Sequence, residues 1–340
     1  MTARTQTTSK RTTSRVAAAP PRLLDGRIRG KRAWTRNTIR PAHYRLPVTA
    51  NVQHEIAVFI ATLRDNPLQI ELLAPEDYAL PRTAALMRAV RGILETGVGF
   101  AVLDRFCVDS YDKEQLKAIY WVLSALLSRP VAQAFKGTML YDVHDTGLIK
   151  GPAVRADVTR QELHFHTDYG YNKAPQFIGL AALRTAKRGG TNSFASLYTA
   201  HNILRRDAPQ LLARLYQPFY LNRYGEHAPG DSVASRHCVF TYDGHTLKGR
   251  FNRRNIIAGH AFVGESLDAL GLAAIDALSE LLESPPLHIS FDLEAGQILY
   301  TMNWQIAHRR TAFVDYKQTD RRRHLVRMFM RDHGARTFNG

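Results

Sequence analysis

Residues 163–168 read LHFHTD, a short run in which histidine and aspartate occupy alternate positions. Side chains two residues apart in an extended strand leave the backbone on the same face. His166 and Asp168 therefore place an imidazole beside a carboxylate. Two histidines and one carboxylate on one face of an octahedron suit iron(II) that must bind other ligands in its open positions. The segment supplies two such ligands, so the third must come from elsewhere in the chain.

His164 shares this face and opens a second interpretation. A cupin-like site would use His164 and His166 together, followed by a glutamate a few residues further on. No glutamate occurs between Asp168 and Pro175. We therefore expect His164 to have a structural or supporting role.

The sequence that follows Asp168 forms the first of two informative blocks. It contains Pro175, an apolar strand over 177–183 and Gly-Gly-Thr at 189–191. The strand ends where the two glycines allow the chain to turn. The block therefore predicts a metal-binding strand, a turn and a second strand in close succession.

The second block lies near the C-terminus. Residues 296–303 read GQILYTMN and lead to His308, and Arg323 and Arg327 follow on a last strand. Together the two blocks resemble the TauD/TfdA (clavaminate synthase-like) family of iron(II)- and 2-oxoglutarate-dependent oxygenases, over about residues 90–332. The first ninety residues are not covered by the resemblance.

The resemblance implies a metal site and a reaction. His166, Asp168 and His308 would bind Fe(II), with 2-oxoglutarate and O2 as cosubstrates. The products would be succinate, CO2 and a substrate oxidised at an unactivated C–H bond. In related halogenases the carboxylate ligand is replaced by a small residue, so Asp168 favours hydroxylation or desaturation over halogenation.

The cosubstrate site is predicted from the same resemblance. Thr191 and Arg323 would bind the distal carboxylate of 2-oxoglutarate, and Arg327 would contact the substrate or the cosubstrate carboxylates. A guanidinium forms a bidentate, charge-assisted pair with a carboxylate, and a threonine adds a neutral donor. The run at 321–323 leaves the register open by one residue. Alternation favours Arg323, which shares a strand face with Arg327.

The substrate is less well defined by the sequence. Several arginines near the predicted site favour a substrate with a carboxylate, sulfonate or phosphonate, and an amino acid or similar small organic acid is the preferred class. Each of these arginines could equally be a surface cation. The candidate substrate-binding residues are Tyr169, Tyr171, Arg250, Asn252, Asn303 and Arg327.

The pattern of predicted elements indicates a fold that is mainly β with flanking helices (α+β). Apolar periodicity predicts early helices over 83–95 and 112–127, and helical inserts near 197–216 and 266–283. Short strands dominate from about residue 160 onward. Many short strands with partners far along the chain suit a double-stranded β-helix, or jelly roll, with helical inserts.

Basic residues are concentrated at the start of the chain. Residues 1–45 hold twelve Lys or Arg and one acid, and so carry +11 of the formal net charge of +16, which leaves +5 for the rest. This segment is rich in Thr, Ser, Ala and Pro and lacks apolar periodicity up to about residue 30, as is typical of disordered chain. We expect a disordered basic extension over 1–45 and a single oxygenase domain over 46–340.

The cellular context follows from composition. Only two cysteines, Cys107 and Cys238, occur, which argues against a disulfide scaffold or a four-cysteine zinc site and indicates a reducing compartment. No run of eighteen apolar residues predicts a membrane span. A cytoplasmic protein is expected, with an organellar one as the alternative because the start of the chain is similar to a transit peptide.

Two other function classes remain open from the residues alone. A zinc-dependent hydrolase could use the same His/Asp/His ligands, but would need a general base and would not need Arg323 or Thr191. A non-catalytic jelly roll could bind nucleic acid through its basic extension, although the rest of the chain has no nucleic-acid motif. The partner expected is a small-molecule substrate, and the sequence leaves the oligomeric state open.

Overall fold

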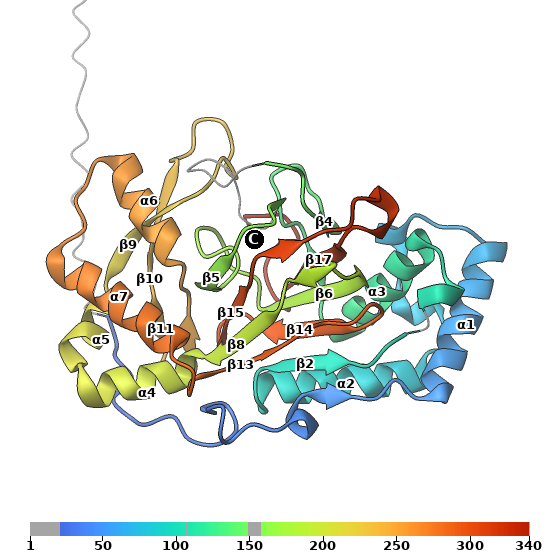
Figure 1. Ribbon diagram of the computed structural model, residues 1–340, viewed down its shortest axis with the longest axis horizontal. Coiled ribbons are helices and arrows are strands. Elements are labelled where there is room, and N and C mark those ends of the chain that lie inside the picture. Colours follow the sequence, from blue (N-terminus) through green and yellow to red (C-terminus); the bar gives the residue numbers. More distant parts are fainter. Residues whose placement is uncertain (1–20, 107, 149–157, 340) are drawn as a thin grey trace, which may run out of the picture.

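Two β-sheets form the centre of the structure (Figure 1), a computed structural model that describes residues 21–106, 108–148 and 158–339. Strands that pair in these sheets are mostly far apart in the sequence, as expected for a jelly roll. The larger sheet contains, in spatial order, β1 (Arg45–Leu46), β2 (Phe100–Leu103), β14 (Ile298–Met302), β6 (Phe177–Arg184), β17 (His324–Met330) and β3 (Pro130–Val131), with β4 (Tyr141–Val143) also paired to β17. The smaller sheet contains β13 (His288–Phe291), β8 (Asn192–Ser196), β15 (Ile306–Arg310) and β5 (Leu163–His166).

Two early helices, α2 (Pro81–Glu95) and α3 (Lys113–Leu127), cover the outer face of the larger sheet, and α1 (Ala50–Asp65) packs against both of them. The strand side chains that face them are apolar, as Val326, Met328 and Met330 show on β17. The opposite face of β17 carries Arg327, as strand alternation predicts, and Arg323, the residue just before the strand, lines the same cavity. Both helices predicted in this region are confirmed, whereas α1 was not predicted.

Aromatic side chains fill one end of the space between the two sheets. Phe194 stacks on Phe100 with ring centroids 5.0 Å apart and on Phe291 at 5.1 Å. Trp34 and Tyr44 complete this cluster from the N-terminal side. Because aromatic rings bury large apolar areas, the cluster closes this end of the jelly roll. The other end remains available for a cavity.

A second helical layer covers the smaller sheet. It consists of α4 (Leu197–Asp207), α5 (Pro209–Leu215), α6 (Arg253–Val263) and α7 (Ala269–Glu283), together with the hairpins β9 (Pro218–Asn222)–β10 (Ala234–Cys238) and β11 (Phe240–Tyr242)–β12 (Leu247–Gly249). The second hairpin turns at Asp243-Gly244. Helix α6 was not predicted from the sequence. Among the described residues, no helix is long and apolar enough to cross a bilayer.

Residues 21–45 lie along the body of the protein, which corrects the expectation that chain disorder extends to residue 45. The Trp34 indole donates to Val98 O at 2.8 Å, and Thr199 of α4 donates to Trp34 O at 2.7 Å. Asn202 of α4 bonds both the N–H and the C=O of Ile28. We call residues 21–45 the N-terminal strap. Residues 1–20 of the predicted extension, and Cys107, lie outside the described residues.

Replacing Trp34 with alanine should lower the free energy of unfolding by about 3–5 kcal/mol, because it removes a side chain that is 3% exposed and leaves a cavity. Urea denaturation monitored by circular dichroism would measure the change. Arg36→Ala is the matched control, since Arg36 is exposed in the same strap and its loss should cost less than about 0.5 kcal/mol. Equal stability of the two variants would mean that the strap does not contribute to the fold.

Candidate metal centre and cosubstrate site

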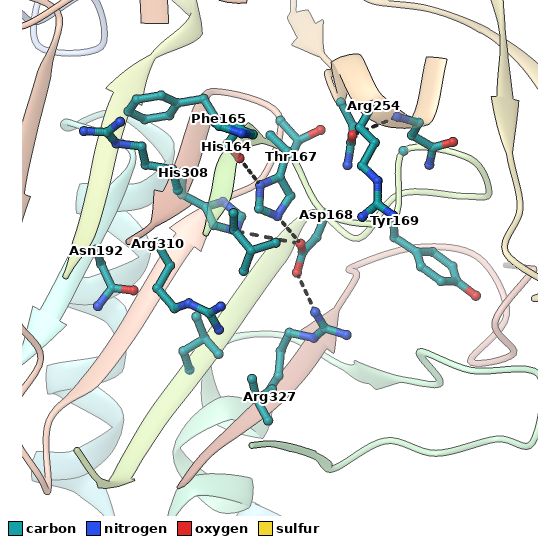
Figure 2. Close-up of a pocket in the computed structure, with 18 of the residues that line it drawn as sticks. His164, Phe165, Thr167, Asp168, Tyr169, Asn192, Arg254, His308, Arg310 and Arg327 are labelled. Carbon is teal, nitrogen blue, oxygen red and sulfur yellow. Dashed lines mark hydrogen bonds and ion pairs between the residues drawn. The ribbon is translucent and has the colours of Figure 1, made fainter. Parts of the chain in front are cut away.

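Two histidines and one aspartate converge at the open end of the jelly roll. Strands β5 and β15 pair antiparallel with His166 opposite His308, and Asp168 follows directly after β5. The Nε2 atoms of His166 and His308 lie 3.4 Å and 3.7 Å from Asp168 Oδ1. Within the described residues this is the group of His, Cys, Asp and Glu side chains close enough to hold a metal ion. Figure 2 shows the side chains of His308 and Asp168 pointing toward one another.

Hydrogen bonds and burial put the three groups in the form that a metal requires. His166 Nδ1 lies 2.8 Å from the His164 carbonyl oxygen, which only accepts, so Nδ1 donates there and Nε2 is the nitrogen that faces Asp168. Burial lowers the pKa of His308 to about 3. Burial alone would raise the pKa of Asp168, but the Arg327 guanidinium and the two histidines hold it well below its usual range. Neutral imidazoles and an ionised carboxylate are the ligand forms of an iron(II) site.

Asn303 holds the backbone of Asp168 in place. Its Oδ1 accepts from Asp168 N at 2.9 Å, and its Nδ2 donates to Asp168 O at 3.0 Å and to Pro175 O at 3.1 Å. Asn303 is 1% exposed, so these bonds lie in a low-dielectric interior. Sequence reasoning placed Asn303 among the substrate residues. Here its amide instead bonds the loop that carries the carboxylate.

Arg250 supports the same loop from the other side. Its Nη1 donates to Gly170 O at 2.6 Å and to Asn172 O at 3.0 Å. Tyr169, between these residues and Asp168, has a φ of +56°, which is uncommon for a side chain other than Gly, Asn or Asp and costs about 1–2 kcal/mol. The loop is therefore held in a strained shape that aims Asp168 at the histidines.

A buried arginine occupies the end of the cavity between the sheets. Arg323 is 5% exposed, and its guanidinium lies 5.0 Å from the Phe313 ring centroid. Its backbone N–H donates to Asp315, and its Nη1 has no hydrogen-bond partner among the described residues. Burial, with help from Arg310, lowers the pKa of Arg323 to about 9, so it remains charged at neutral pH. A buried cation with an unsatisfied N–H suits an anionic ligand.

The turn after the two glycines reaches the cavity through Asn192 rather than Thr191. Residues 189–190 both have positive φ, 75° and 81°, and lead the chain sharply into β8. Asn192 pairs with Arg310, two residues after the cluster histidine, so it shares that histidine's face and lines the cavity. Thr191 exchanges hydrogen bonds with Thr311 and is not among the described lining residues. Its role toward 2-oxoglutarate stays a prediction.

These groups open into one cavity of about 390 Å³. Tyr169, Tyr171, Asn252 and Arg327, four of the predicted substrate residues, line it, whereas Arg250 and Asn303 are not among its described lining. Arg254 was not among the candidate substrate residues, although the segment 249–254 is similar to one that helps form the substrate site in the family. It extends from the first turn of α6 toward Asp168 (Figure 2).

Comparison with known proteins agrees with this geometry. Residues 65–329 match the family described as taurine catabolism dioxygenase TauD, TfdA family. The chain belongs to this family. As a TauD/TfdA-family protein it is a non-haem iron(II)- and 2-oxoglutarate-dependent oxygenase, as the two motif blocks predicted.

Individual relatives extend over most of this TauD/TfdA-family chain. FR-33289 synthase of Streptomyces rubellomurinus is 26% identical over 322 residues, covering 93% of this chain and 94% of that protein. Taurine hydroxylase-like protein SAT17 of Stachybotrys chartarum is 23% identical, covering 82% and 72%. Among solved structures, asparagine oxygenase with Fe(II), 3-hydroxyasparagine and succinate has a TM-score of 0.66 at 15% identity, covering 85% of this chain and 94% of its own. The iron oxygenase OrfP with Fe and α-ketoglutaric acid has a TM-score of 0.64 at 16% identity, with the same coverage. These structures share the jelly-roll fold.

Replacing Asn303 with alanine should destabilise the fold by about 2–4 kcal/mol, because three buried backbone groups lose their partner. It should also weaken Fe(II) binding about tenfold or more, because the carboxylate loop is released. Asn202→Ala is the control, because the Asn202 amide also bonds a backbone N–H and a backbone C=O, both of Ile28, but lies away from the metal cluster. Chemical denaturation and anaerobic metal titration give the two values. Unchanged metal affinity in Asn303→Ala would contradict the role assigned to this amide.

Proposed function

We propose that His166, Asp168 and His308 hold the Fe(II) of this oxygenase. The observation that carries the proposal is the convergence of two imidazoles and one carboxylate, whose ligand atoms lie within 4.8 Å of one another, at the open end of the jelly roll. When bound, Fe(II) and 2-oxoglutarate activate O2 for attack on a substrate C–H bond, with release of succinate and CO2. Asp168 provides the third protein ligand, which favours hydroxylation or desaturation.

We further propose that Arg323 binds the distal carboxylate of 2-oxoglutarate. Its guanidinium is buried on the Phe313 ring and keeps one N–H without a partner among the described residues. Asn192 lines the same cavity and is the neutral amide that we assign to the cosubstrate together with Arg323. A fixed cation with a neutral donor binds a carboxylate with little rearrangement, so the keto end of the cosubstrate is directed toward the metal cluster.

The substrate that we propose is a small molecule with an anionic group, of the amino-acid or organic-acid class. Among the described residues that line the cavity, six are arginines and one, Asp168, is an acid. Arg254 extends from the first turn of α6 toward Asp168 (Figure 2), and it is the cation that we assign to the substrate.

Aromatic side chains on the same side complete the proposed substrate site. Tyr169 and Tyr171 pack with ring centroids 4.8 Å apart, and Tyr224 packs against Tyr171 at 6.0 Å. All three line the cavity. Their rings exclude water from the reacting carbon, which protects it from side reactions.

We also propose that residues 46–340, together with the strap, form one catalytic domain.

The metal and cosubstrate assignments can be tested by adding Fe(II) and 2-oxoglutarate to the metal-free protein without oxygen. The weak visible charge-transfer band of the chelate should appear in the wild type and disappear in His308→Ala, which removes one of three ligands. His164→Ala should keep the band, because His164 is largely exposed and gives His166 only its backbone carbonyl. Arg323→Ala should keep the band but need about 100-fold more 2-oxoglutarate. A folded wild-type protein that forms no band while binding Zn(II) tightly would contradict the assignment.

The substrate class can be tested by succinate release in the presence of L-amino acids, alkylsulfonates and alkylphosphonates, each beside a neutral analogue. Anionic members should be turned over in preference to the neutral ones. Arg254→Ala should raise KM for the accepted substrate about tenfold or more, since a charge-assisted contact is lost. Arg253→Ala should have a smaller effect, because Arg253 is paired with Asp276. Equal turnover of neutral and anionic analogues would exclude the proposed class.

A further inference from the structure

A buried glutamine lies behind the metal cluster and was not singled out from the sequence. Gln133 follows β3 and is 0% exposed. Its Nε2 donates to Met139 O at 2.7 Å and to Arg327 O at 2.9 Å, and its Oε1 accepts from Arg327 Nε at 2.9 Å. Gln133 is not among the described residues that line the cavity. It can affect the reaction only through a neighbour.

The orientation of the Gln133 amide follows from its partners. Two carbonyl oxygens face one end of the amide and can only accept hydrogen bonds. The Arg327 guanidinium faces the other end and can only donate. One orientation alone satisfies all three contacts, so Gln133 fixes Arg327 both at its backbone carbonyl and at its Nε.

Two aromatic rings pack near the Arg327 guanidinium, in addition to the hydrogen bond with Gln133. Its guanidinium carbon lies 5.0 Å from the Tyr141 ring centroid and 4.8 Å from that of Phe329. The group is 5% exposed, and its Nη1 donates to Asp168 Oδ2 at 3.2 Å. The planar guanidinium of Arg327 is therefore fixed in one orientation, in which it bonds a single oxygen of the Asp168 carboxylate.

The two oxygens of Asp168 consequently have different surroundings. Oδ2 is bonded to Arg327, whereas Oδ1 is the oxygen near the Nε2 atoms of His166 and His308. A carboxylate with one oxygen engaged by a fixed guanidinium has one oxygen left to offer a metal. If the carboxylate were released, both oxygens could turn toward the metal and occupy a second position.

We propose that Gln133 is a positioning residue that acts through Arg327 to make Asp168 a one-oxygen ligand. This rests on the proposed function, since it takes Asp168 as a metal ligand. The chain Gln133–Arg327–Asp168 keeps the remaining positions of the metal clear for the cosubstrate and O2. It also links the cavity to the ligand, because Arg327 lines the cavity while bonding Asp168.

The test uses Mn(II) bound to the otherwise metal-free protein, without cosubstrate. Its dissociation constant is measured by titration, and its water ligands are counted from the broadening of its electron paramagnetic resonance lines in ¹⁷O-water. Three protein atoms leave about three positions for water in the wild type. Gln133→Met keeps the bulk but none of the hydrogen bonds. It should raise the Mn(II) dissociation constant about tenfold and remove one water.

Two further variants make the result decisive. Gln297→Met alters another buried glutamine, 3% exposed, and should keep the wild-type affinity and water count. Arg327→Lys keeps the positive charge. The two hydrogen bonds that Gln133 donates to backbone carbonyls remain, but the hydrogen bond from Arg327 Nε to Gln133 Oε1 is lost. This variant should show the same loss of one water, and it carries the test alone if Gln133→Met does not fold. Adding Gln133→Met to Arg327→Lys should change neither the affinity nor the water count further, because both substitutions act through the Arg327 guanidinium.

The outcomes separate this inference from the proposed function. If wild-type protein binds no Mn(II), the metal assignment itself fails. If the wild type binds Mn(II) and folded Gln133→Met keeps its affinity within about twofold and its full water count, the positioning role of Gln133 is overturned. An effect of Gln133→Met that adds in full to that of Arg327→Lys would also overturn it, because the glutamine would then act by another route.

Discussion

The antiparallel pairing of β5 with β15 is the constraint on which the site depends. It sets His166 opposite His308, two residues that are 142 positions apart in the sequence. The short interstrand distance of a β-ladder then brings two imidazoles together without any flexible element. The loop after β5 has only to turn Asp168 back toward them. The positive φ of Tyr169 and the hydrogen bonds of the Asn303 amide both stabilise that turn. The fold therefore sets the positions of the three side chains before any ligand binds.

Charge compensation is the second constraint. A buried carboxylate is costly unless it is paired, and here Arg327 and the histidines hold Asp168 ionised. Arg323 is buried just as deeply but has a partnerless N–H among the described residues. The two arginines line the same cavity at a spacing of four residues, yet one is used inside the protein and the other is available to a bound anion. The difference lies in their neighbours and not in their residue type.

The sequence predicted the family, the jelly roll and the residues that converge at the metal cluster, because those rest on strand alternation and motif spacing. It did not single out Asn192, which lines the cavity one residue after the predicted Thr191, because the turn geometry of the two positive-φ glycines cannot be read from spacing alone. Residues 21–45 carry no apolar periodicity. Their packing against the domain depends on single side chains such as Trp34, so it could not be predicted from a sequence pattern. Gln133 lacks any local signal, because its importance comes from partners that lie more than 190 residues further along the chain.

The N-terminal strap has a consequence for how the chain reaches its native state. Its anchors are paired with residues made much later: Ile28 with Asn202 of α4, and the backbone of Arg36 with Pro286. The central strands β14 and β17 of the larger sheet also come from the last fifty residues or so. Such long-range pairing implies slow folding with large loop-closure entropy. During synthesis, the early helices must therefore expose their apolar faces until the ribosome has released almost the whole chain, which makes nascent protein dependent on protection from aggregation.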